Sequence, residues 1–194
     1  MHRFLLFVGL GTSLAAAGAC RGRDARGMTP LMWAARAGAV DEMKALLDEG
    51  ADSTVRDVAH GWTPLFHAIH KGQTEAVRLL LDRGVDPNRF ARMLSPLAMA
   101  AADRDPAIVR LLLAHGADVR ASGIGGATAL TVAVSGGALM DIDRPLFGGC
   151  HLETVKALLA HDPTLRLPDS IAGREALWWA RFHGCAEVLK LVHG

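Results

Sequence analysis

Aromatic residues are scarce in this sequence, and tyrosine is absent altogether. Only 5% of the 194 residues are aromatic, which argues against the base-stacking surface of proteins that bind single-stranded nucleic acids. Charge of either sign is also not in excess, since 21 basic residues balance 20 acidic ones and leave a net charge of +1. No global field attracts DNA, RNA or an anionic membrane. We therefore expect no nucleic-acid partner.

Cysteine is almost as rare, and the common catalytic and metal-binding motifs are missing. Three cysteines without C-x-x-C spacing disfavour both a disulfide scaffold and a structural zinc site. His67 and His70 are three residues apart but lack the carboxylate of a zinc-protease motif. The glycine-rich segment 123–126 has no Lys-Ser/Thr after it, so a loop is favoured over a phosphate cradle. We predict no metal, no cofactor and no enzymatic activity.

The first twenty residues have the layout of a secretory signal peptide. A short basic start precedes an apolar run over residues 4–14, and small residues then lead to Cys20. The junction resembles a bacterial lipobox, which predicts removal of residues 1–19, lipidation of Cys20 and a short linker over residues 20–23. Ordinary signal-peptidase cleavage, which leaves a soluble periplasmic protein, and a buried N-terminal helix are the alternatives. The predicted location is the periplasm, or a lipid anchor on an envelope membrane facing the periplasm.

The rest of the chain is repetitive. The segment 27–38 returns as 61–72, and the Leu-Leu-Asp-x-Gly-[Ala/Val]-Asp element at 46–52 returns at 80–86, so both are displaced by 34 residues. A third copy covers 95–118. Each copy starts with a Thr or Ser that suits a helix N-cap, followed by a Pro suited to the first helical turn. Leucines at helical spacing then predict a second, amphipathic helix.

This pattern resembles the ankyrin repeat. The resemblance covers residues 24–194 and implies an all-α solenoid of stacked helix-turn-helix units with β-hairpin fingers. About five repeats are expected, with an insertion at 138–150 that interrupts the fourth, while the fifth stops before any finger. Arg104 stands where the glycine between the two helices is expected. We expect a monomer.

Two further sets of residues can be placed in this repeat frame. Trp33, Trp178 and Trp179 lie in first helices, where packing between repeats is favoured over a ligand cage. Cys150 and Cys185 lie at the same edge of adjacent repeats. Two outcomes remain open for these cysteines, a disulfide or two buried free thiols.

The resemblance also implies a function, since ankyrin domains bind other proteins through their fingers and the concave face of the first helices. It therefore predicts a protein-interaction module of the bacterial envelope that stabilises or inhibits its partner. One alternative is a cytosolic adaptor with an uncleaved N-terminus. Another is an enzyme or metal site built on the insertion 138–150, for which the polar candidates are Asp141, Asp143, Arg144 and His151.

The predicted binding surface lies in the N-terminal half of the repeats. Its candidate residues are Arg26, Met28, Arg36, His60, Trp62, His70, Lys71, Arg92 and Leu94. In this set Trp62 is an aromatic anchor surrounded by cationic groups, a composition common at binding hot spots. The local basic excess predicts a partner protein with an acidic patch.

Overall fold

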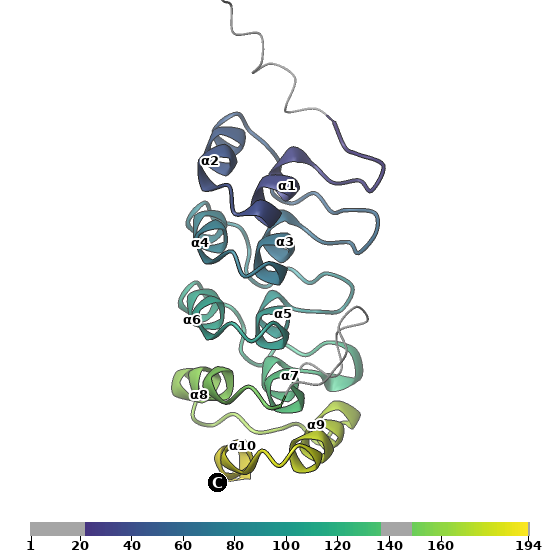
Figure 1. The fold of residues 1–194 in the computed structure, drawn as a ribbon, viewed down its shortest axis with the longest axis vertical. Helices are drawn as coiled ribbons and strands as arrows, with labels where there is room; N and C mark the ends of the chain where they lie inside the picture. The colour runs from purple at the N-terminus through teal and green to yellow at the C-terminus, as the bar shows by residue number, and fades with distance from the viewer. Residues whose placement is uncertain (1–21, 137–148, 194) are drawn as a thin grey trace, which may run out of the picture.

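The computed structural model describes residues 22–136 and 149–193, which form a stack of helix pairs (Figure 1). The α-helices of this part of the chain are α1 (Pro30–Ala37), α2 (Val40–Asp48), α3 (Pro64–His70), α4 (Thr74–Asp82), α5 (Pro96–Ala102), α6 (Pro106–Ala114), α7 (Ala129–Ser135), α8 (Leu152–His161), α9 (Ile171–Phe182) and α10 (Ala186–His193). One short 3-10 helix, η1 (Ile124–Gly126), precedes α7.

The helices lie in two columns, and each repeat contributes one helix to each column (Figure 1). Odd-numbered helices pack in the order α1, α3, α5, α7, α9, and even-numbered helices follow the same order beside them. Loops project from the side of the odd-numbered column. Each helix pair therefore buries its apolar surface mainly against neighbouring pairs, as expected for a solenoid.

The fingers differ from the expected β-hairpins. Within the described residues the structure contains no regular strand, and a single antiparallel bridge joins Ala91 to Leu94. The other fingers are turns closed by local backbone hydrogen bonds, such as the one from the Asp57 amide to the Trp62 carbonyl at 2.9 Å, and by side chains. The physical reason is that backbone groups near each tip bond within the turn or to side chains such as Asp57, so they do not form a ladder between strands.

Local sequence explains where the first helices start and end. Ser95 Oγ accepts a hydrogen bond from the Ala98 amide at 3.1 Å, and the Thr29 side chain accepts one from Met32 at 3.3 Å. Thr63 occupies the same place but makes no such capping bond. Gly38 ends α1 with a left-handed φ of 71°, a conformation that costs glycine little.

The core is a column of equivalent side chains, two from the second helix of each of the first four repeats. These side chains are almost completely buried, and the predicted leucine spacing identifies them: Leu46, Leu80, Leu112 and Leu158, preceded by Met43, Val77, Val109 and Val155. Because one repeat cannot bury this surface alone, the stability of the chain depends on contacts between neighbours.

The last repeat departs from the others at its start. Helix α9 begins at Ile171, before the position equivalent to Thr63, because Ser170 Oγ accepts a hydrogen bond from the Gly173 amide at 3.2 Å. Most of the predicted insertion and the predicted signal peptide lie outside the described residues. In the part of the chain that is described, no helix is both long and apolar enough to cross a membrane.

Candidate protein-binding surface

Asp57 holds the finger between the first two repeats in shape. Its Oδ1 accepts hydrogen bonds from the backbone amides of His60 at 2.7 Å, Gly61 at 2.8 Å and Trp62 at 3.3 Å. Its Oδ2 lies 2.9 Å from Nε2 of His67, a buried side chain on α3. The Asp57 side chain is itself 1% exposed. Asp57 therefore fixes the turn and ties it to the first helix of its repeat.

The electrostatics of this pair follow from burial. Burial acts to raise the pKa of Asp57, but the amides of His60 and Trp62 and the adjacent His67 outweigh it, so the pKa is lowered. Burial lowers the pKa of His67 despite the nearby carboxylate. Neutral His67 then donates its Nε2–H to ionised Asp57.

Trp62 is enclosed by three imidazole rings. The distances between ring centroids are 4.7 Å to His60, 5.4 Å to His67 and 5.0 Å to His70. The indole is only partly exposed and packs against the hydrophobic core. Histidines from both the finger and α3 surround the ring, so the predicted anchor Trp62 offers only part of its surface to a partner.

Two arginines connect this finger to the next one along the stack. Arg56 donates hydrogen bonds to the carbonyl oxygens of Gly61 at 2.9 Å and Phe90 at 2.5 Å. Arg92 donates one to the carbonyl of Ala59 at 2.6 Å. Sequence reasoning identified Arg92 but missed Arg56 and Asp57. The adjacent fingers are thus bound together through side-chain to backbone hydrogen bonds.

The tip of the second finger has an unusual backbone. Arg92 and Met93 have φ values of 44° and 68°, in the left-handed region that favours glycine. They are the two central residues between Ala91 and Leu94, whose backbone groups exchange hydrogen bonds of 3.0 Å and 2.9 Å. Such a turn prefers Asn-Gly. Two long side chains are therefore held outward at a cost in conformational energy.

Apolar side chains extend from successive finger tips. Val58 is 73% exposed, Met93 59% and Ile124 65%. Their separation along the chain approximates the repeat length, but the sequence analysis did not find them because the repeat pattern leaves finger tips variable. Two exposed cations accompany the first two tips, Arg26 and Arg92, and a third, Lys71, is exposed at the end of α3. No ion pair within the described residues involves Arg26 or Lys71.

The remaining predicted binding residues differ in accessibility. Met28 is 6% exposed, so its place on the predicted surface is corrected: it packs in the core below the finger. Leu94 is half-buried against the core. Arg36 is half-buried, and its carbonyl accepts a 3.5 Å hydrogen bond from Gln73. His70 lies 3.6 Å from the carboxylate of Asp103.

The candidates for the alternative enzyme or metal site can be placed only in part, because one of the four lies among the described residues. No group of three or more metal-ligating side chains occurs among them. His151, one candidate of the alternative site on the insertion, is buried, and its Nδ1–H donates to the carbonyl of Ala101 at 2.7 Å. The other candidates, Asp141, Asp143 and Arg144, lie outside the part of the chain that is described.

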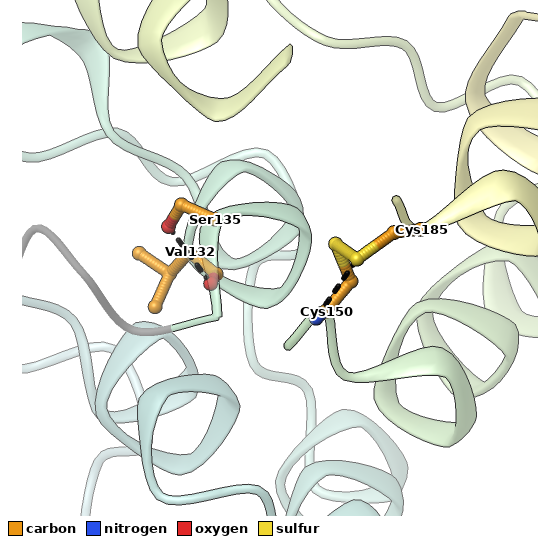
Figure 2. Close-up of a disulfide and its surroundings, with 4 residues drawn as sticks. All are labelled: Val132, Ser135, Cys150 and Cys185. Carbon is orange, nitrogen blue, oxygen red and sulfur yellow. Dashed lines mark hydrogen bonds between the residues drawn. A yellow bond between two sulfur atoms is a disulfide. The ribbon is translucent and has the colours of Figure 1, made fainter. Parts of the chain in front are cut away.

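Cys150 and Cys185 form a disulfide with 6.0 Å between their Cα atoms, the first of the two outcomes left open above. Figure 2 shows the bond beside α7, where Ser135 donates a 3.1 Å hydrogen bond to the carbonyl of Val132. Cys150 lies just before α8 and Cys185 just before α10. The disulfide therefore fastens the last repeat to the one before it.

The architecture is that of a helix-pair solenoid whose fingers project from the side of the odd-numbered helices (Figure 1). A family model for "Ankyrin repeats (3 copies)" matches residues 4–91, and one for a single "Ankyrin repeat" matches residues 94–124. Together they cover more than half of the sequence, and the chain belongs to the ankyrin-repeat family. The first match begins inside the segment predicted to be a signal peptide.

One curated relative is an E3 ubiquitin-protein ligase, XBAT33 of Arabidopsis thaliana. It is 37% identical over 103 residues, which are 53% of this chain and 18% of the relative. The chain thus spans less than a fifth of that protein. Ankyrin repeats are protein-interaction modules and typically have no enzymatic activity of their own.

Proposed function

We propose that this chain binds a partner protein with an acidic patch through a surface, here called the cationic finger surface, formed by Arg26, Val58, Lys71, Arg92 and Met93. The observation that carries the proposal is the combination of exposed apolar finger tips with neighbouring exposed cations. The partner is stabilised or inhibited by this contact.

The chemistry of the cationic finger surface favours a protein ligand. Val58 and Met93 offer apolar area to be removed from water, and methionine adapts its shape to an irregular partner. Lys71 makes no ion pair with a described residue, and Arg26 interacts electrostatically with the exposed Asp24 without forming a salt bridge, so an acidic partner adds an attraction at both cations. The left-handed turn supports the proposal, because strained backbone tends to occur at functional sites.

Charge reversal tests this proposal. A tagged wild-type chain is used to isolate its partner from the native host, and affinity is then measured with the purified pair. Arg26→Glu combined with Lys71→Glu should weaken binding at least tenfold and reduce its salt dependence, because two attractive contacts become repulsive (about 1.4 kcal/mol per tenfold). Lys44→Glu on α2, in the other helix column, should leave the affinity unchanged. Equal losses in both variants would contradict the proposed surface.

The location of the protein is a second part of the proposal. We propose that the chain is exported to the bacterial envelope, with lipidation of Cys20 after removal of residues 1–19. The Cys150–Cys185 disulfide supports an oxidising compartment. The family match that begins at residue 4 favours the alternative, a cytosolic adaptor that retains its N-terminus as part of the repeats. Intact mass from the native host distinguishes the two, since retention of Met1 would exclude export.

A further inference from the structure

Helix α9 has an exposed apolar stripe on the side that faces away from the stack. Ile171, Trp178 and Phe182 are separated by seven and four residues and therefore lie on one side of the helix. Trp178 is 57% exposed and Phe182 is 67% exposed. The opposite side of α9 carries three buried alanines: Ala172, Ala176 and Ala180. α9 packs on α7 and lies at the end of its column (Figure 1).

Comparison with the inner repeats shows what this stripe is. Trp178 lies three residues after Glu175, which stands at the place of the N-cap Thr or Ser of the other repeats. The residues at the place of Trp178 in the first four repeats are fully or almost fully buried: Met32, Phe66, Ala98 and Thr131. The counterparts of the exposed Arg181 are buried completely: Ala35, Ile69, Ala101 and Val134. In each inner repeat the next odd-numbered helix packs on the one that carries these residues. The end face of α9 is therefore a stacking surface that no further odd-numbered helix among the described residues covers.

We propose that this end face is a second binding site, and that its occupant is an amphipathic α-helix of a partner protein with acidic residues beside its apolar stripe. A helix is expected because the α1–α3, α3–α5, α5–α7 and α7–α9 contacts cover the equivalent surfaces with a helix each time. The site is distinct from the cationic finger surface and does not depend on it.

The charge around the stripe specifies the acidic flank. Arg181 is exposed and makes no ion pair with any residue that the structure describes. Arg174 lies near the same flank, where it pairs with Asp169 at 3.2 Å. On a helical projection both arginines fall on one side of the Trp178 stripe. An acidic side chain on the incoming helix would therefore find an unpaired guanidinium beside the apolar contact.

The same charges argue against a second copy of this chain as the occupant. In a two-fold arrangement that packs α9 antiparallel to its copy, the same flank of each helix would meet. The Arg174 and Arg181 side chains of both copies would gather along one edge and repel each other. A partner helix with acidic residues on that edge has no such conflict.

The aromatic side chains are already arranged for contact. Trp178 stacks on Phe182 with 5.3 Å between ring centroids and 10° between ring planes. Trp179 meets the Trp178 ring edge-on at 5.0 Å. Rings held by one another lose little conformational freedom on binding, which is one reason why tryptophan is common at hot spots.

Two synthetic helical peptides test the site. Both carry a leucine stripe, flanked by Glu in one peptide and by Lys in the other, and each is titrated against the full chain. We expect the Glu peptide to bind more tightly than the Lys peptide. Arg181→Glu should reverse that order, and Trp178→Ala should weaken binding of the Glu peptide about thirtyfold. Trp33→Ala removes another exposed tryptophan, on α1, and should change nothing.

Three results would overturn the inference. The first is the absence of peptide binding, and the second is equal binding of both peptides. The third is a dimer, seen by light scattering, that the Trp178→Ala substitution dissociates. Such a dimer would identify a second copy of the chain as the occupant. Circular dichroism verifies that each variant is folded. The Arg26→Glu, Lys71→Glu double variant should bind the Glu peptide like wild type, so failure of the proposed function and failure of this site are told apart.

Discussion

The turn at the tip of the second finger gives the sharpest prediction, replacement of Arg92-Met93 by Asn-Gly. Each left-handed non-glycine residue costs roughly 1–2 kcal/mol, and both residues of this pair are in that region, with φ values of 44° and 68°. Asn-Gly is the preferred pair for such a turn. The introduced glycine makes the unfolded chain more flexible, which offsets about 0.5–1 kcal/mol of this gain in stability.

One contact is lost in the exchange. The Arg92 guanidinium donates a 2.6 Å hydrogen bond to Ala59, and an exposed bond of this kind contributes about 0.5–1 kcal/mol. We therefore expect the Asn-Gly variant to be more stable by about 1 kcal/mol, measured by urea unfolding. The same variant removes a cation and an apolar tip from the cationic finger surface, and its affinity for the partner should fall.

A matched control separates strain from function. Arg104 has a φ of 61° at the turn between α5 and α6, where the other repeats have glycine. Arg104→Gly should raise stability by about 0.5–1 kcal/mol and leave partner affinity unchanged. An Asn-Gly variant less stable than wild type would show that the turn stores no strain. A stabilised variant that bound the partner equally well would show that the strained finger tip has no role in binding.

Three further predictions concern stability. Asp57→Ala removes the acceptor of three backbone amides and of His67 and should cost about 3 kcal/mol in urea unfolding, whereas a cost near zero would contradict its structural role. Burial lowers the pKa of His67 and His151, so stability is full above the unfolded value of about 6.5 and is lost as pH falls below it; a melting temperature unchanged from pH 7 to pH 5 would refute this. Cys185→Ser removes the disulfide between residues 35 positions apart, which contributes about 4 kcal/mol to stability. The variant should show faster amide exchange in α10, to the same extent as the wild-type chain after reduction. Equal exchange in the variant, the reduced chain and the oxidised chain would contradict this role of the disulfide.

The sequence predicted the architecture well because repeat chemistry is local. N-cap hydroxyls at Thr29 and Ser95, prolines after them, and leucines at helical spacing each act within one or two helical turns. Several copies in phase make these weak preferences specific. The fingers were less predictable, since the presence of strands depends on pairing between backbones rather than on local residue type.

The binding surface was predicted only in part, because exposure is a tertiary property. Trp62 precedes the Thr-Pro-Leu turn and has the position of a surface anchor, yet three histidines enclose it. Asp57 could be found by its analogy to Asp24, which accepts hydrogen bonds from the amides of Arg26 and Met28 in the first repeat. The two aspartates lie at different distances from the following Thr, so no fixed spacing identifies them.

Trp178 shows a different limit. Its position in the repeat predicts packing between repeats, and in the inner repeats that position is buried. The prediction is wrong for Trp178 because no further helix among the described residues covers α9. Local pattern specifies which side chain faces the next repeat, but whether a neighbour is there depends on the assembly.

The most direct test of the cationic finger surface is hydrogen exchange of the chain with and without its isolated partner. Contact with a partner protects backbone amides at the interface and leaves distant ones unchanged. We predict new protection in the fingers around Val58 and Met93 and at the Lys71 end of α3, with no change in α2 and α4. Protection confined to the even-numbered helices would contradict the proposed surface.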